Sequence, residues 1–122
     1  MKKILLMTLL IMSLNCNAKD ICENSETQGE YIDCLYTENL NPIKKLVDDN
    51  VETISIQLRQ REIPGIKHLL NSNEAWKLHV ENECQYLYDT EAETTSDYVI
   101  KYNCLIDKYK ERLSILHSYT YD

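Results

Sequence analysis

Four cysteines constrain the fold of this chain more than any other feature: Cys22, Cys34, Cys84 and Cys104. They follow a segment with the pattern of an export signal, and an even number of cysteines in a short exported chain indicates a disulfide framework. Four cysteines allow three connectivities. We expect Cys22–Cys34 and Cys84–Cys104, because the members of each pair are close in sequence, and the two other connectivities stay open.

The first residues have the pattern of a secretory signal. Two lysines precede an apolar run at residues 4–14, and at about eleven residues this run is shorter than the roughly 20 that a membrane-spanning helix needs. The small residue Ala18 predicts a signal peptide over residues 1–18 that is cleaved there. Cys16 leaves a lipid-modified N-terminus open, but the residues before it suit a lipoprotein signal poorly. We therefore expect a protein of the periplasm or a secreted protein.

The remaining chain, residues 19–122, is strongly acidic. Loss of Lys2 and Lys3 leaves eleven Lys and Arg against twenty Asp and Glu, a formal net charge of −9. This charge argues against nucleic acid or anionic lipid as a partner, because both need a basic patch. It suits a basic protein, although solubility alone also accounts for it. A chain of this length builds one small domain, which two disulfides would stabilise.

The spacing of apolar residues predicts an all-α bundle of three or four helices. The chain has only two glycines and two prolines, fewer than a sheet with tight hairpins needs. The expected stripes are Ile43, Val47, Val51, Ile54 and Leu58, then Leu69, Trp76, Val80, Cys84 and Leu87, and last Tyr102, Leu105, Tyr109, Leu113 and Leu116.

Several residues mark the expected ends of these helices. Thr27 followed by Glu30 is a capping box and predicts the start of the first helix. Pro42 starts a second helix or kinks the first. Residues 63–65, Ile-Pro-Gly, are the clearest break. The polar residues 89–97 predict a loop, after which Ser96 or Asp97 caps the last helix.

No residue pattern indicates catalysis, a metal or a cofactor. The histidines at 68, 79 and 117 have no Ser or Asp arrangement typical of a triad, and disulfides would consume the thiols that a Cys–His nucleophile needs. His79 and Glu83 share a helix face, but two ligands do not make a metal site. Twenty acids guarantee chance carboxylate pairs, so such pairs do not indicate a glycosidase. We expect no enzyme activity.

An acidic run and its tyrosines are the candidate binding site. Residues 81–97 contain six acids and no Lys or Arg, which would steer a basic protein toward them. Tyrosine supplies rigid contact area at interfaces. The candidate partner-binding residues are Glu81, Glu83, Tyr86, Tyr88, Asp89, Glu91, Glu93 and Asp97. An acidic loop that is merely solvated remains the alternative.

Trp76 and Arg112 are expected to be structural. Trp76 is the only tryptophan and lies on an apolar stripe, so it is predicted to be a core residue. Arg112 is predicted to pair with a carboxylate at the surface of the bundle.

Three motifs surround the cysteines. The first is TQGEYIDC at residues 27–34, the second is NEAW at residues 73–76 with Cys84 after it, and the third is Cys104 followed by Arg112 and Leu116. With these motifs the chain resembles the N-terminal domain family of the lysozyme inhibitor LprI from residue 22 to about residue 116. It departs from that family at Val80 and Tyr109, where Arg and Thr are common.

The resemblance implies an exported helical domain that is not an enzyme and that in some members is linked to inhibition of lysozyme. We therefore expect a binding domain that occludes a basic, lysozyme-like cell-wall hydrolase. Two alternatives stay open. One is an immunity protein against a toxin delivered to the periplasm, such as a peptidoglycan amidase. The other is an envelope-maintenance factor.

The signal peptide makes a prediction that intact mass can test. The protein recovered from the envelope of an expressing cell should have the mass of residues 19–122 with no free thiol, because the signal is cleaved and the other cysteines pair. Blocking thiols without prior reduction should add no mass. A mass that still includes residues 1–18, or that shows a lipid on Cys16, would contradict the predicted cleavage.

Overall fold

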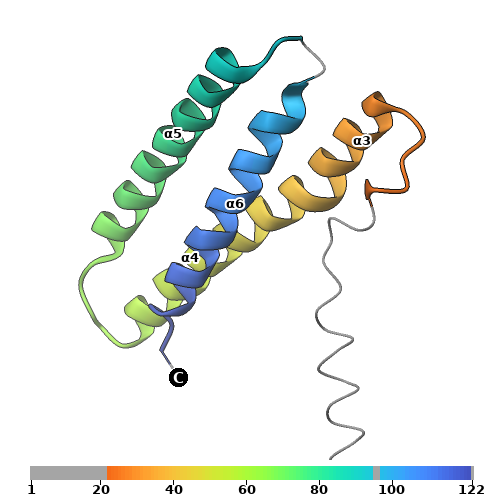
Figure 1. Ribbon diagram of the computed structural model, residues 1–122. Coiled ribbons are helices and arrows are strands. Elements are labelled where there is room, and N and C mark those ends of the chain that lie inside the picture. The colour runs from red at the N-terminus through yellow and green to blue at the C-terminus, as the bar shows by residue number, and fades with distance from the viewer. Residues whose placement is uncertain (1–21, 95–96, 122) are drawn as a thin grey trace, which may run out of the picture.

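Three helical rods pack side by side in the computed structural model, which describes residues 22–94 and 97–121 (Figure 1). The first rod consists of α3 (Gln28–Cys34), the π-helix η1 (Leu35–Leu40) and α4 (Asn41–Gln60). The second is α5 (Ile66–Glu91) and the third is α6 (Tyr98–His117). Every element of the described ranges is a helix, so the all-α prediction is confirmed. The expected signal peptide lies outside the described residues.

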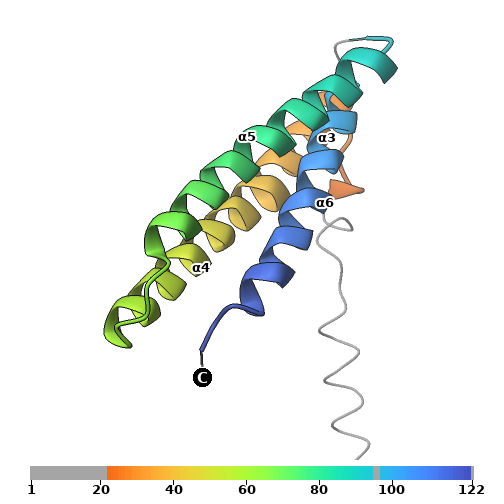
Figure 2. The same cartoon turned by 90° about the vertical axis from the view of Figure 1, so that its left-hand side faces the viewer.

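Each rod contacts the other two, and the chain reverses direction between them. Figure 2 shows α4, α5 and α6 along one another in a second view. The turn after α4 lies at one end of the bundle, and the connection from α5 to α6 lies at the other (Figure 1). Among the residues with described structure, no helix is long and apolar enough to cross a membrane.

The first rod begins at the predicted cap. The Thr27 hydroxyl accepts a hydrogen bond from the backbone N–H of Glu30 at 3.1 Å, which satisfies one of the free donors of the helix start. The Glu30 carboxylate does not complete a capping box with Thr27. It accepts from the backbone N–H of Glu26 instead, also at 3.1 Å.

Pro42 lies in the first turn of α4, so it marks a helix start as expected, yet the rod continues through it. Proline has no N–H to donate to the carbonyl four residues earlier, which here belongs to Glu38. The preceding turn is the wider π-helix η1, in which the N–H of Asn41 reaches the carbonyl of Tyr36, five residues back. The wider turn places Leu35 and Leu40 in the core.

The break at residues 63–65 is where the structure reverses direction between α4 and α5, as predicted. Glu62 has a φ of 55° and Gly65 a φ of 132°. A side chain at position 65 would meet no neighbour within 4 Å, but its backbone conformation would be strained, which explains the glycine.

The core follows the predicted stripes most closely in α4, where all five positions are buried. Val80 and Cys84 of α5, and Leu105, Tyr109 and Leu116 of α6, are also buried. The half-buried members are Leu69, Trp76 and Leu87 in α5, and Tyr102 and Leu113 in α6. Periodicity did not identify the buried polar residues Asn39, Ser55, Asn73 and Arg112.

Two disulfides form as expected, Cys22–Cys34 and Cys84–Cys104, each with a Cα–Cα distance of 5.6 Å. The first holds the N-terminal segment against the end of α3. The second joins α5 to α6. By the chain-entropy estimate, loops of 12 and 20 residues each contribute about 3 kcal/mol.

The predicted loop over residues 89–97 is too long, because α5 continues to Glu91. Hydrogen bonds within the helix hold this polar end: Gln85 Nε2 donates to Asp89 Oδ1 at 2.8 Å, and the Thr90 hydroxyl donates to the carbonyl of Tyr86 at 3.0 Å. Asp97 occupies the cap position of α6, but its carboxylate accepts from the backbone N–H groups of Glu93 and Thr94 instead. Ser96, the other predicted cap, lies outside the described residues.

Substitutions at two leucines test the core. Leu35→Ala should lower the free energy of unfolding by about 2–5 kcal/mol, because the side chain is 0% exposed where η1 meets α6. Leu46→Ala removes the same atoms from α4 at a position 48% exposed, so it should change stability by about 0.5 kcal/mol or less. Urea denaturation measures both. An equal decrease in the free energy of unfolding for the two variants would contradict the packing of η1.

Candidate functional site

The six acids of residues 81–97 do not form one surface. The Glu81 carboxylate lies 2.6 Å from Lys101 Nζ, and the Glu83 carboxylate lies 3.4 Å from Lys108 Nζ and 3.4 Å from His79 Nε2. Both lysines belong to α6. Packing of α5 against α6 therefore supplies the positive charges that the segment itself lacks, and Glu81 and Glu83 serve the contact between the two helices.

The four remaining acids lie at one end of the bundle, and we call Asp89, Glu91, Glu93 and Asp97 the acidic end. Asp89 accepts from Gln85, and Asp97 accepts from the loop backbone. In the described ranges, no Lys, Arg or His forms an ion pair with any of the four. The negative charge of this end is therefore not neutralised locally.

A shallow hollow of about 310 Å³ lies within the acidic end, lined by Tyr88, Asp89, Ala92, Glu93 and Thr94. Partial burial raises the pKa of Tyr88 above its usual value, and the charges of Tyr98, Asp97 and Asp89 raise it further.

The two predicted aromatic contact residues differ in their surroundings. Tyr88 stacks on Tyr98, with ring centroids 4.8 Å apart and an interplanar angle of 16°. Tyr86 is 68% exposed. Its ring has no aromatic neighbour among the described residues. Tyr88 is therefore held in place before any partner binds, whereas Tyr86 is not.

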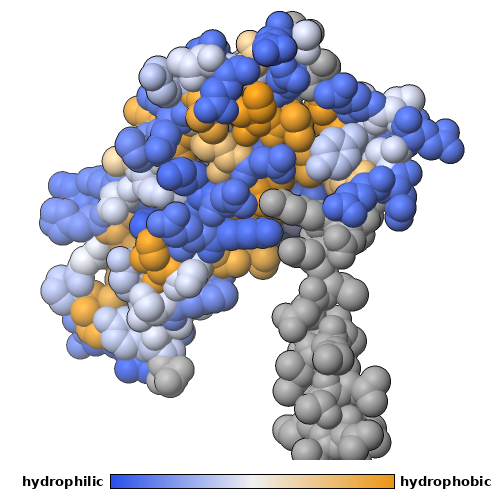
Figure 3. All heavy atoms as spheres, in the orientation of Figure 1, coloured by the Kyte–Doolittle hydropathy of each residue, from blue (hydrophilic) through white to orange (hydrophobic). Residues whose placement is uncertain are grey.

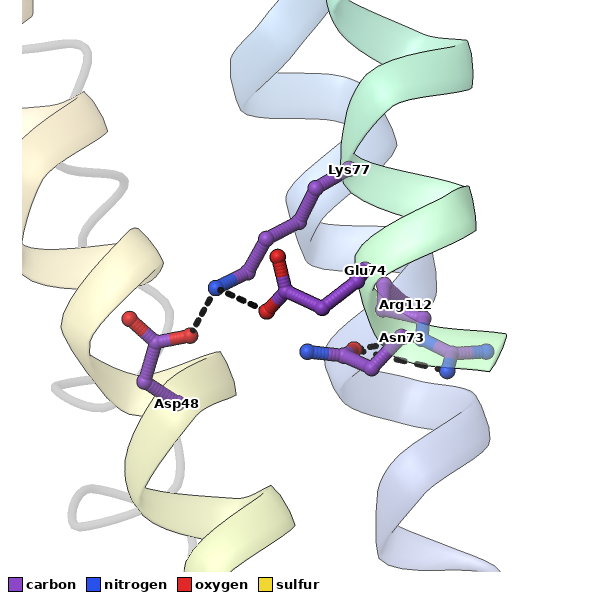
Figure 4. A network of polar contacts seen from close by, with 5 residues as sticks. All are labelled: Asp48, Asn73, Glu74, Lys77 and Arg112. Carbon is purple, nitrogen blue, oxygen red and sulfur yellow. Dashed lines mark hydrogen bonds and ion pairs between the residues drawn. The ribbon is translucent and has the colours of Figure 1, made fainter. Parts of the chain in front are cut away.

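Arg112 is buried, and within the described residues no carboxylate forms an ion pair with it, so the predicted carboxylate pair at the bundle surface is not found (Figure 4). Its Nε and Nη2 atoms each donate to Asn73 Oδ1 at 3.4 Å, and its guanidinium carbon lies 5.3 Å from the centre of the Trp76 ring. Trp76 also packs edge-on against Tyr109 at 4.8 Å. An amide oxygen from α5 and an aromatic face thus take the place of the expected carboxylate, and Trp76 and Arg112 both lie in the contact between α5 and α6.

A second polar network in Figure 4 joins α4 to α5. Lys77 Nζ lies 2.7 Å from Asp48 and 3.6 Å from Glu74. The hydrogen bond to Asp48 is the main cause that raises the pKa of Lys77 above 10.5. The ion pair therefore stabilises the folded state fully when the pH is below the usual pKa of lysine. This stabilisation is lost as the pH rises through the raised pKa that Lys77 has in the folded state. The pair is partly exposed, so its contribution is about 1 kcal/mol or less.

Two further hollows lie away from the acidic end. One of about 180 Å³ is lined by Trp76, Arg112 and Lys108, but Glu83 and Glu111 line it too, so opposite charges offset each other. The other, of about 390 Å³, lies against the C-terminal tail and has an apolar floor formed by Ile54, Leu58 and Leu69. The amide of Gln57 and the backbone of Tyr121 exchange two hydrogen bonds of 3.0 Å, which hold the tail in place.

The described residues contain no group of three or more His, Cys, Asp and Glu side chains placed to hold a metal ion. His79 and Glu83 contact each other, and Glu83 also reaches Lys108. His68 and His117 are exposed.

Comparison with protein-family models, with curated proteins and with solved structures found no match to this chain.

Replacement of Trp76 tests its structural role. Trp76→Ala should lower the free energy of unfolding by about 3 kcal/mol, the lower end of the usual range, because the ring is only half-buried. It also leaves the Arg112 guanidinium buried without its aromatic face. The control Tyr86→Ala should cost about 0.5 kcal/mol or less. A Trp76 variant that unfolds at the same urea concentration as the parent would refute the structural role.

Proposed function

We propose that this chain is an exported binding domain of the lysozyme-inhibitor type, which occludes a basic cell-wall hydrolase and performs no chemistry itself. The observation that carries the proposal is the acidic end, four carboxylates without a basic partner in the described chain. A local negative potential steers a positively charged protein and raises its association rate.

The disulfides support a location outside the cytoplasm. Disulfides persist in the periplasm and in secreted proteins, whereas cytosolic thiols are kept reduced. Both bonds here have an ordinary Cα–Cα distance of 5.6 Å, so they need no distortion of the helices. We place the protein in the periplasm or among secreted proteins on this basis and on the predicted signal peptide.

The resemblance to the LprI family is consistent with the same function, and its motif residues lie between the helices. Trp76 and Arg112 belong to different motifs, and in the structure they contact each other between α5 and α6. Asn73, which opens the second motif, accepts from the same guanidinium. These motif residues hold the helices together. The contact with a partner is therefore assigned to residues outside the motifs, and the acidic end is the best candidate.

The charge of the acidic end gives a direct test. Asp89→Asn, Glu91→Gln and Glu93→Gln together should slow the association of a basic lysozyme about three- to tenfold at low salt, because rim charges act mainly on association. The difference from the parent should shrink at high salt. The melting temperature should stay nearly unchanged, because exposed charges contribute little to stability. Stopped-flow or surface-based kinetics at two salt concentrations measure the rates.

The matched control removes three acids elsewhere, by Asp49→Asn, Glu52→Gln and Glu62→Gln. These residues are exposed on α4 and the turn after it, at a distance from the acidic end (Figure 1). The control has the same net charge as the test variant but should associate at close to the parent rate. Equal slowing by the two triple variants would remove the acidic end from the account, and failure of the parent to bind or inhibit the enzyme would refute the proposed function.

A further inference from the structure

Four tyrosine rings from three elements form a continuous row. Tyr88 of α5 stacks on Tyr98 at 4.8 Å, Tyr98 lies 6.0 Å from Tyr102 in α6, and Tyr102 lies 5.7 Å from Tyr36 in η1. We call these four residues the tyrosine row. Only Tyr88 belongs to the acidic run that the sequence singled out, because the row is assembled from segments that are far apart in the chain.

The row is accessible to a partner. Tyr36 and Tyr98 are each 41% exposed, and Tyr88 and Tyr102 are half-buried. Figure 3 shows apolar side chains over the N-terminal part of α6, with hydrophilic side chains around them. Exposed aromatic groups with a polar rim are typical of protein interfaces.

Both disulfides lie close in sequence to members of the tyrosine row. Cys34 is two residues before Tyr36, Cys84 is one helical turn before Tyr88, and Cys104 is two residues after Tyr102. The Cys84–Cys104 bond joins the two helices that carry Tyr88, Tyr98 and Tyr102, and the ring contacts order the rings against one another. Contact residues that are already ordered lose little conformational entropy on binding, which favours affinity.

Among the described residues, no Lys or Arg lies over a ring of the row. Within the described residues, three aromatic rings have a cationic group over them: Tyr109, Tyr121 and Trp76. None of these rings belongs to the row. Lys101 lies between Tyr98 and Tyr102 in sequence, but its ammonium group binds Glu81 and Gln85 at 2.6 and 2.8 Å.

We propose that the tyrosine row binds an arginine-bearing segment of a basic protein, with guanidinium groups against the exposed parts of the rings that the stacking within the row leaves open, and with the acidic end attracting the same segment. Charge complementarity selects this occupant, because the row starts at Tyr88 beside Asp89 and Glu93. The planar guanidinium stacks on aromatic rings better than an ammonium group does, so arginine is preferred to lysine. The inference rests on the proposed function for the identity of the natural partner, but the row itself can be tested with a peptide.

The test is a titration with a capped tetra-arginine peptide, followed by NMR of the tyrosine ring signals. The signals of Tyr36, Tyr88, Tyr98 and Tyr102 should shift together, and a tetra-lysine peptide should shift them less. Tyr36→Ala should raise the dissociation constant of the tetra-arginine peptide about two- to fivefold, because one exposed cation–π contact is lost. The matched control is Tyr119→Ala, a tyrosine 48% exposed just beyond α6 at the opposite end of that helix, which should bind like the parent.

The outcomes separate this inference from the proposed function. Shifts confined to Tyr88, no shifts in the row, or equal affinity of the Tyr36→Ala and Tyr119→Ala variants would each overturn the inference, even if the parent binds lysozyme through its acidic end. Shifts along the whole row with a specific loss in Tyr36→Ala would support it, even if the parent fails to bind any lysozyme. Circular dichroism of the variants confirms that each stays folded.

Discussion

The pairing of α5 with α6 is the contact on which the rest of the structure depends. The Cys84–Cys104 bond joins the C-terminal part of α5 to the N-terminal part of α6, and Cys84 is fully buried there. On one side of this bond lie the stacked rings of Tyr88 and Tyr98, and on the other lies the buried contact of Arg112 with Asn73. The ion pairs of Lys101 and Lys108 join the same two helices. The covalent bond and the polar, aromatic and charged contacts thus all hold the same two helices in one register.

The sequence predicts the parts of the fold that depend on residues close in the chain. The apolar stripe of α4, the Thr27 cap and the break at residues 63–65 all follow from local spacing and backbone preferences. The cysteine pairing followed from the same reasoning. The π-helix η1 could not be predicted in this way. The missing N–H of Pro42 shows where the helix is disturbed, but it does not show how the preceding turn adjusts.

The candidate site was harder to predict, because its charge depends on residues from another helix. A count within residues 81–97 gives six unneutralised acids, but Lys101 and Lys108 neutralise Glu81 and Glu83 in the folded chain. The same limit explains Arg112, whose amide partner on α5 precedes it by 39 residues. Tyr36 escaped notice for the same reason: only the fold brings it to the aromatic residues of α6. The negative charge that stays without a basic partner is therefore smaller than the sequence suggests, but it lies beside the ordered rings of the tyrosine row.

Hydrogen exchange of the chain with and without a basic lysozyme tests the central claim most directly, because it locates the contact without any substitution. The account predicts slower exchange in the last turns of α5, in the first turns of α6 and in η1, with the outer face of α4 around Leu46 and Ile56 unchanged. Protection confined to α4 or to the C-terminal tail would show that the enzyme binds elsewhere. Absence of protection anywhere, at enzyme concentrations that saturate other inhibitors, would contradict the account.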